Sequence, residues 1–436
     1  MSPWQDDPGR GASGALTADV DARERRRSTR VLAIATGGFT VCFAVWVMFA
    51  IVGIPVRKEF GLSEGQFAFL AAIPILTGSI LRVPFGILTD RVGGRLLFSA
   101  LLVASAVPTY LVSRASSYGQ LVVLAFFVGL AGVSFAVGIA WVSAWYPASR
   151  QGFALGMFGA GNVGASITKL LAPTLVTLIG AGGVAGGFVP GGWRLVPFAY
   201  TILLLATAAA VLVVAPRPDH KPAAGRSLRD VSRPLAVLRV WRFGLYYIVV
   251  FGAYVALSLW LPKYYVDVYD VGLRDAGFLT AIFIFPASLL RPLGGWLSDR
   301  LGARPVTYTA FVVMCGALIW LSFELGIVLF TALVAVVGVM MGIGKASVYR
   351  YIADYFPRDV GAVGGLVGAV GGVGGFVLPL LFAWAHDASG RAESTFLVLL
   401  VASLVSLIWL HLVVIKMRRD ERRRSVAAAS GEVVDA

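Results

Sequence analysis

The sequence predicts an all-α membrane protein with twelve transmembrane helices in two pseudo-symmetric six-helix bundles. Three observations support this fold class. Of the 436 residues, 58% are hydrophobic and only 14% are charged, whereas about 25% of residues are charged in an ordinary soluble protein. Apolar runs of about 20 residues, the length that crosses a bilayer, recur along the whole chain. In addition, a motif of the first half returns in the second half.

The expected spans follow one another with short connections, except at one place. The twelve ranges are 31–54, 66–89, 95–113, 119–142, 150–178, 194–214, 242–264, 275–297, 304–322, 326–352, 359–385 and 393–415. The exception is the stretch 215–241, which is polar, basic and proline-containing. This linker separates two sets of six spans.

The chain therefore divides into five parts, and the basic residues orient them. These parts are a tail (1–30), a six-helix bundle (31–214), the linker (215–241), a second bundle (242–415) and a second tail (416–436). Basic clusters in both tails, in the linker and in two short loops all fall on one side of a twelve-span protein. Because such clusters stay on the cytoplasmic side, we expect both termini and the linker in the cytoplasm of a plasma or inner membrane. Residues 1–30 are polar and show no cleavable signal peptide.

An internal repeat relates the two halves. The stretch 79–91 reads SILRVPFGILTDR, and 288–300 reads SLLRPLGGWLSDR, so that Arg82 and Arg291 occupy equivalent positions 209 residues apart. Two homologous halves in parallel orientation place a substrate site near the midplane, at the interface between the halves. The second and eighth spans are therefore expected to face each other across that site.

The end of each repeat carries a loop motif. GILTDRVGGR and GWLSDRLGAR resemble the signature loop of the major facilitator superfamily, a family of membrane carriers. In each copy an aspartate ends a helix beside basic residues and a glycine turn, which predicts a charge clasp between helices. We expect these residues to steer conformational change and not to bind substrate; they are Asp90, Arg91, Arg95, Asp299, Arg300 and Arg304.

Four positive charges lie deep within the expected spans. Arg82 precedes Asp90 by eight residues, about 12 Å along a helix, Arg291 is its counterpart, and Lys169 and Lys345 lie in the fifth and tenth spans. Such charges are costly in a bilayer and usually mark a site or pathway. No carboxylate lies equally deep, so a bound anion is expected to neutralise them. Two planar guanidinium groups suit a planar oxyanion; the alternative is that each arginine clamps neighbouring carbonyl groups.

Glycine-rich stretches mark the fifth and eleventh spans, GMFGAGNVGAS (156–166) and GGLVGAVGGVGGF (364–376). Small residues let membrane helices approach closely, and packing alone explains many of them. Their density in both halves also suggests close backbone approach around a small ligand, at Gly161, Gly371 and Gly372. Asn162 can donate N–H groups to an oxyanion, or it can form a helix–helix hydrogen bond.

Together these features resemble the nitrate/nitrite porters (NarK-type) of the major facilitator superfamily, as does the stretch CFAVWVMFAIVGIPVRKEFGLSE (42–64). The resemblance implies a bilayer-embedded carrier that works by alternating access. It implies that Arg82 and Arg291 bind nitrate, or nitrite, and that Asn162 hydrogen-bonds it. Phe135, Tyr247 and Phe251 would wall the site. We expect a monomer, because each half already supplies a partner surface for the other. The residues themselves give no sign of an enzymatic site, a cofactor or a metal centre, and the basic residues lie in the tails and loops and not in a nucleic-acid-binding module.

The two lysines point to one branch of this family. GNVGASITK and GIGKASVYR, which contain Lys169 and Lys345, look like the branch held to be nitrate/proton symporters. Uptake of an anion against an inside-negative potential costs about 2.3 kcal/mol per 100 mV and charge. Since no carboxylate or histidine lies deep in a span, the lysines are the candidate proton carriers, or they line the anion pathway.

Several alternatives stay open at the level of the sequence. A nitrate/nitrite exchanger needs no proton carrier. An organophosphate:phosphate carrier also uses paired arginines, although the narrow glycine lining disfavours a bulky substrate. A membrane receptor is disfavoured by the short tails, and a membrane enzyme by the lack of histidine partners for Ser79 and Ser288.

Overall fold

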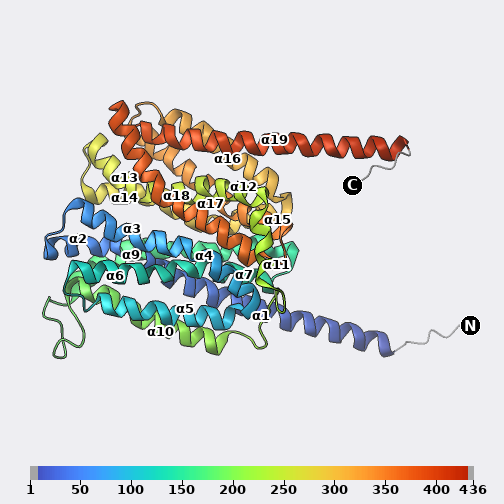
Figure 1. Ribbon diagram of the computed structural model, residues 1–436, viewed down its shortest axis with the longest axis horizontal. Helices are drawn as coiled ribbons and strands as arrows, with labels where there is room; N and C mark the ends of the chain where they lie inside the picture. Colours follow the sequence, from blue (N-terminus) through green and yellow to red (C-terminus); the bar gives the residue numbers. More distant parts are fainter. Residues whose placement is uncertain (1–7, 431–436) are drawn as a thin grey trace, which may run out of the picture.

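The computed structural model describes residues 8–430 and is almost entirely helical. The first half of the chain (blue to green in Figure 1) and the second half (yellow to red) lie side by side as two bundles. The start of α1 (Pro8–Trp46) and the end of α19 (Ser394–Ser430) lie at the same end of the molecule, together with the linker helix α11 (Leu228–Ser232). We call this end the terminal face, and the end that carries α2 (Phe49–Phe60) the opposite face.

Within the described residues, eleven helical segments are long and apolar enough to cross a membrane. Their elements are α1 (Pro8–Trp46), α3 (Glu64–Ile80) with α4 (Arg82–Val92), α5 (Gly94–Val112), α6 (Tyr118–Val128) with η1 (Gly129–Val133) and α7 (Ser134–Trp145), α10 (Leu195–Val214), α12 (Leu238–Tyr247) with η6 (Ile248–Gly252) and α13 (Ala253–Tyr269), α14 (Leu273–Leu289) with α15 (Arg291–Leu301), α16 (Ala303–Leu321), α17 (Ile327–Tyr355), α18 (Val360–Ser389) and α19 (Ser394–Ser430). Short 3-10 helices η2 (Ala148–Arg150), η4 (Gly192–Arg194) and η5 (Arg233–Ala236) lie in the connections.

The fifth expected span, 150–178, is a composite of three elements. It consists of α8 (Gln151–Gly159), the 3-10 turn η3 (Ala160–Val163) and α9 (Gly164–Leu178). Glycine lowers helix stability, and here it is required by close packing on α1. A Cβ atom at Gly164 would lie 2.1 Å from the Thr40 carbonyl oxygen. The interruption therefore follows from the glycines that the sequence concentrates there.

The ends of the first and last spans also differ from expectation. Helix α1 begins at Pro8 and α19 continues to Ser430, so parts of both tails extend membrane helices. The first span, expected to reach residue 54, ends at Trp46, and α2 follows after a turn.

Helix breaks recur at one level of the two bundles. The second and eighth spans break at Leu81 and Leu290, so that Arg82 and Arg291 are the first residues of α4 and α15. The fourth span contains the 3-10 turn η1, and the seventh contains the π-helical turn η6. Departures from α-helical geometry inside long helices are frequent at functional sites.

The two halves meet tightly at the terminal face, along two helix pairs related by the repeat. Helix α18 packs on α4, and α8 packs on α15. A Cβ atom at Gly361 would lie 2.4 Å from the Gly86 carbonyl oxygen, and one at Gly152 would lie 2.6 Å from the Gly295 carbonyl oxygen. Only glycine permits backbones to approach this closely. The terminal face is therefore closed.

The linker lies across this closed face and contacts both halves. Asp219 accepts hydrogen bonds from the indole N–H groups of Trp141 and Trp145, each at 3.0 Å, in the first half. Arg226 forms an ion pair of 2.7 Å with Asp359, which precedes α18 in the second half. The linker thus connects the two bundles at the terminal face.

Candidate functional site

Arg82 and Arg291 lie at the centre of the molecule, between the two halves. Both side chains are fully buried, with 0% exposure. Their Cζ atoms lie 5.3 and 5.5 Å from the ring centroid of the same residue, Phe135 on α7. The repeat therefore places two guanidinium groups beside one aromatic ring. Burial of a cation without an opposing charge is costly, and in the described part of the chain no carboxylate pairs with either arginine.

The two arginines differ in their hydrogen bonds. Arg82 donates from Nε to the Gly132 carbonyl oxygen at 3.1 Å and from Nη1 to the Gly368 carbonyl oxygen at 2.7 Å. Its Nη2 has no partner. Arg82 is thus partly a clamp on neighbouring carbonyl groups, as the alternative interpretation of the sequence holds, and it keeps one free donor group.

The hydrogen-bond donors of the Arg291 guanidinium are all unused among the described residues. Its Nε, Nη1 and Nη2 atoms are all buried without a hydrogen-bond partner among the described residues. The Tyr247 hydroxyl lies beside this guanidinium but makes no hydrogen bond of good geometry with it. A Cβ atom at Gly159 would lie 2.2 Å from Arg291 Cζ, so the guanidinium rests directly on the α8 backbone. Unmet donors of a charged group carry a large desolvation cost, which an anion would remove.

Aromatic rings surround the pair. The Phe135 ring is parallel to Tyr247 and to Phe251, with centroids 6.3 Å apart in both cases, and Tyr349 meets it edge-on at 5.2 Å. The sequence resemblance implies the first three as walls of a substrate site, and in the structure these rings lie beside the two arginines. Tyr349 of α17 and Trp46 of α1, whose ring centroid lies 5.0 Å from Arg82 Cζ, complete the enclosure.

The predicted glycines take different positions. A Cβ atom at Gly372 would lie 2.0 Å from Ser79 Oγ and 3.4 Å from Arg82 Nη1, and one at Gly371 would lie 2.4 Å from the Tyr247 ring. Both are therefore at the site. Gly161 instead packs against Phe39 of α1, because a Cβ atom at Gly161 would lie 2.6 Å from the Phe39 ring. In the fifth span it is Gly159, two residues earlier, that contacts the arginine.

Asn162 follows in the turn η3. Its side chain is fully buried, and neither Nδ2 nor Oδ1 has a hydrogen-bond partner within residues 8–430. The alternative role as a helix–helix hydrogen bond is therefore not realised in this structure. An amide with unused donors is what an oxyanion ligand requires.

Lys345 of α17 belongs to the same buried region. Its ammonium donates to the Ala287 carbonyl oxygen at 3.0 Å and lies 3.2 Å from the Tyr254 ring centroid. The Tyr254 hydroxyl in turn bonds Ser288, the counterpart of Ser79, at 2.9 Å. The lysine is fully buried, and its charge interacts with that of Arg291. Three cations are thus buried together.

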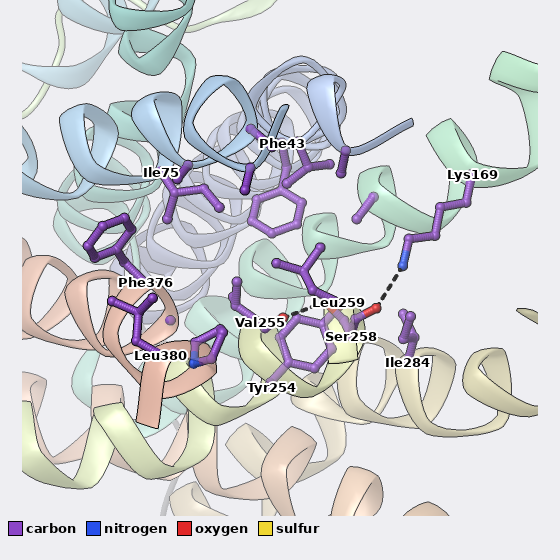
Figure 2. A pocket seen from close by; sticks show the side chains of 18 of the residues that line it. Phe43, Ile75, Lys169, Tyr254, Val255, Ser258, Leu259, Ile284, Phe376 and Leu380 are labelled. Carbon is purple, nitrogen blue, oxygen red and sulfur yellow. Dashed lines mark hydrogen bonds between the residues drawn. The ribbon is translucent and has the colours of Figure 1, made fainter. Parts of the chain in front are cut away.

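Lys169 lies apart from these cations, in a cavity of about 420 Å³ toward the opposite face. Figure 2 shows it reaching from α9 across to the Ser258 carbonyl oxygen on α13, at 3.3 Å. Tyr254 and Gly375 line the inner part of this cavity, whereas neither arginine does. The buried pair is therefore separated from the cavity by a layer that includes Tyr254.

The loop-motif aspartates bind helix N-termini, not basic residues of their own loops. Asp90 accepts from the backbone N–H groups of Gly361 and Ala362, at 3.2 and 3.1 Å, at the start of α18. Asp299 accepts from those of Gly152 and Phe153, both at 2.8 Å, at the start of α8. A carboxylate at a helix N-terminus is favourable because it satisfies free N–H groups and the helix dipole. Each aspartate thus fastens one half to the other.

The arginines of the two loop motifs do not form the charge clasp with the motif aspartates that the sequence suggests. Arg95 donates to the Leu212 carbonyl oxygen, Arg300 lies 4.2 Å from the Trp296 ring centroid, and Arg304 contacts Met417. The ion pair of the clasp comes from outside the motif, since Arg350 of α17 bonds Asp299 at 3.0 Å. The Arg91 side chain forms no hydrogen bond or ion pair with the other described residues.

Sequence reasoning missed Gly159, Trp46, Tyr254 and Tyr349. Tyr349 follows Lys345 by one helical turn, so the 3.6-residue period could have placed it on the same face. Gly159 matches Gly368 in the repeat, and the structure gives both contacts with an arginine side chain. Trp46 and Tyr254 carry no comparable signal, because their contacts with Arg82 and Lys345 join distant segments.

Comparison with known proteins bears on what this arrangement does. The chain matches the family model described as Major Facilitator Superfamily over residues 34–278 and 269–434. It is 52% identical over 418 residues to the "Probable nitrate/nitrite antiporter NarK1" of Thermus thermophilus, covering 92% of this chain and 94% of the relative. It is 32% identical to the "Nitrite extrusion protein" of Bacillus subtilis, covering 85% and 91%, and 31% identical to the "Probable nitrate transporter NarT" of Staphylococcus epidermidis, covering 88% and 96%.

Solved structures share the fold at much lower identity. The outward conformation of the transporter FucP aligns with a TM-score of 0.69 and 17% identity, over 87% of this chain and 98% of that one. The human organic anion transporter MFSD10 aligns with a TM-score of 0.71 and 13% identity, over 89% and 99%. These similarities confirm the predicted two-bundle fold.

Proposed function

Because this chain belongs to the major facilitator superfamily and, within it, to the NarK-type nitrate and nitrite transporters, we propose that it carries nitrate across the membrane by alternating access, with nitrite as a second substrate. As a transporter of that family it is a multi-pass membrane protein and not an enzyme. The finer proposal is that nitrate moves inward together with protons.

One observation supports the choice of a small, negatively charged substrate. Arg82 and Arg291 offer four N–H-bearing nitrogens without a partner beside one phenyl ring, and no carboxylate among the described residues pairs with either arginine. A planar monovalent oxyanion fits between two planar donors. The surrounding rings and the glycine contacts leave little room for a larger organic group, which disfavours an organophosphate substrate.

Lys345 supports the coupling to protons. Its ammonium has one carbonyl partner and a π-face, and it adds a third positive charge to the region of Arg291. Like charges favour loss of the lysine proton, whereas an anion between the arginines favours its retention. Lys345 would therefore take up a proton as nitrate binds and release it as nitrate leaves. Lys169, which is remote from the arginines, is assigned to the anion pathway.

The loop motifs and the topology complete the proposal. Asp90 and Asp299 hold the terminal face closed and must release α18 and α8 when that face opens. The basic clusters favour a cytoplasmic position for the terminal face. The carrier would act as a monomer in the lipid bilayer, since each half covers the other.

Nitrate uptake into proteoliposomes tests the proposal directly. With an inward proton gradient and no internal nitrite, we expect gradient-dependent uptake that Arg291→Lys abolishes, because lysine cannot present a planar donor pair. Lys345→Met should remove the response to the gradient. Uptake by Lys345→Met that still follows the gradient would exclude that lysine as the proton carrier.

A nitrate/nitrite exchanger is the second candidate, favoured by the relative that is 52% identical, which is named a probable nitrate/nitrite antiporter. Exchange of two monovalent anions moves no net charge and requires no proton. Uptake that needs internal nitrite and ignores the proton gradient would support exchange. An absence of nitrate flux under both conditions would overturn nitrate as the substrate.

A further inference from the structure

Lys169 extends between two cavities that lie toward the opposite face. Two cavities of about 420 and 590 Å³ share Lys169 and Ser258 in their linings. Lys169 comes from the first half and Ser258 from the second, and Figure 2 shows the hydrogen bond between them. The lysine thus stands where both cavities meet, between the two halves.

The ammonium of Lys169 is poorly satisfied in this position. It can donate three hydrogen bonds, and the structure gives it one, which is long at 3.3 Å. No aspartate or glutamate is found among the described residues that line the two cavities. The walls are mostly alanine, leucine, isoleucine and phenylalanine, and a charge in such surroundings interacts strongly with any counter-ion.

A second polar group points to a ligand at the same place. Ser166, one turn before Lys169 on α9, lines the larger cavity and is only 5% exposed. Its hydroxyl has no hydrogen-bond partner within the part of the chain that the structure describes. The exposed residue Arg274 of α14 lines the same cavity. A buried hydroxyl without a partner is unfavourable and would be satisfied by an oxygen of a bound anion.

We propose that Lys169 and Ser166 form an outer binding site for a small monovalent oxyanion, which the anion occupies before it reaches the arginine pair. This inference rests on the proposed function, because it assumes an anionic substrate. The anion replaces the weak bond to the Ser258 carbonyl oxygen. Arg274 raises the local anion concentration at the cavity, and the layer that includes Tyr254 separates the outer site from the inner one.

Transport kinetics give the first test. In proteoliposomes, Lys169→Met should raise the KM for nitrate about tenfold, the effect of losing one charge-assisted hydrogen bond, with a much smaller change in kcat. Lys169→Arg keeps the positive charge, so its KM for nitrate should be closer to that of the native protein. Lys263→Met, at an exposed lysine of α13 paired with Asp267, is the matched control. An unchanged KM with loss of the proton-gradient response in Lys169→Met would overturn the outer site.

A labelling experiment tests the site without relying on transport. The two native cysteines, Cys42 and Cys315, are replaced by alanine. Leu259 lines both cavities without belonging to the proposed site, so it is replaced by cysteine as the labelling position. Nitrate, compared with gluconate at equal ionic strength, should slow the reaction of this cysteine with N-ethylmaleimide. The protection should persist with Arg291→Lys and disappear with Lys169→Met.

The outcomes separate the two proposals. Protection that depends on Lys169 in a protein without nitrate flux would support the outer site and count against the proposed function. Protection that depends on Arg291 and is indifferent to Lys169 would overturn the outer site while leaving the arginine pair intact. An equal labelling rate in nitrate and gluconate would also overturn it.

Discussion

At the residue scale, the two arginines are equivalent in sequence but not in structure. Arg82 donates to two carbonyl groups, whereas the donors of Arg291 have no partner among the described residues. Arg82 therefore has a structural role in addition to its proposed binding role, whereas the donors of Arg291 are free for the proposed ligand. This difference leads to separable effects on stability and transport.

Arg82→Lys and Arg291→Lys should both abolish nitrate uptake, but only the first should destabilise the protein. Loss of the bonds to Gly132 and Gly368 leaves buried carbonyl groups unsatisfied, at about 1–3 kcal/mol, so the Tm without nitrate should fall by about 2–4 °C. Arg291→Lys should change the Tm by less than about 1 °C on the same scale. Equal Tm values for the two variants, in thermal unfolding of detergent-solubilised protein, would contradict this interpretation.

Gly159→Ala tests the backbone contact beneath Arg291. The added methyl group would stand 2.2 Å from Arg291 Cζ, so the guanidinium must move. We expect the KM for nitrate to rise about tenfold, corresponding to about 1.4 kcal/mol of binding. Gly37→Ala is the control, because a Cβ atom there meets nothing within 4 Å. Similar uptake kinetics for the two alanine variants would show that Gly159 does not position the arginine.

At the element scale, carboxylates form hydrogen bonds that link helix ends to neighbouring elements. At the opposite face, Glu59 of α2 accepts hydrogen bonds from Trp193 and Arg194 of η4, at distances of 2.6–3.0 Å. At the terminal face, Asp90 and Asp299 accept from the first N–H groups of α18 and α8. The first contact joins elements of one half, and the second joins the halves.

The Glu59 contact predicts a modest pH dependence of stability. The hydrogen bonds from Arg194 lower the pKa of the Glu59 carboxyl. A lowered pKa in the folded state means that the contact stabilises the protein above the ordinary glutamate pKa, about 4.3. Its contribution is lost as the pH falls through the lowered value. Because the pair is partly exposed, Glu59→Gln should reduce the Tm at neutral pH by about 2 °C or less. The gap between the two proteins should close on acidification, and a gap that widens would refute the assignment.

At the scale of the whole molecule, the structure is closed at the terminal face and has cavities toward the opposite face. The closure depends on backbone contacts between Gly152 and Gly295 and between Gly86 and Gly361. The two contacts are related by the repeat, as are the two aspartate caps beside them. Alternating access would require both contacts to separate together, because the halves move as bodies.

Gly152→Val should hold the terminal face open. The valine side chain cannot fit against the Gly295 carbonyl oxygen, which a Cβ atom alone would approach to 2.6 Å. Spin labels at Ser149 and Leu301, both exposed at the terminal face, should report a longer distance in the variant, and nitrate uptake should be lost. Gly119→Val, at a glycine with open space around it, should leave the distance unchanged. Identical distance distributions in both variants would exclude this closure mechanism.

The sequence by itself determined the helices, the repeat and the set of buried cations, because hydrophobic length, internal similarity and the cost of a charge in lipid are local properties of the chain. Through resemblance to a family it also predicted Phe135, Tyr247 and Phe251 as site residues, and their rings lie near the arginines. Only the tertiary structure decided which donors stay free. The partners of Arg82 lie 50 and 286 residues away, Gly159 reaches Arg291 across the interface between the halves, and Lys169 enters the outer cavity instead of the arginine pair. Such contacts depend on how two bundles dock, and no local pattern encodes that geometry.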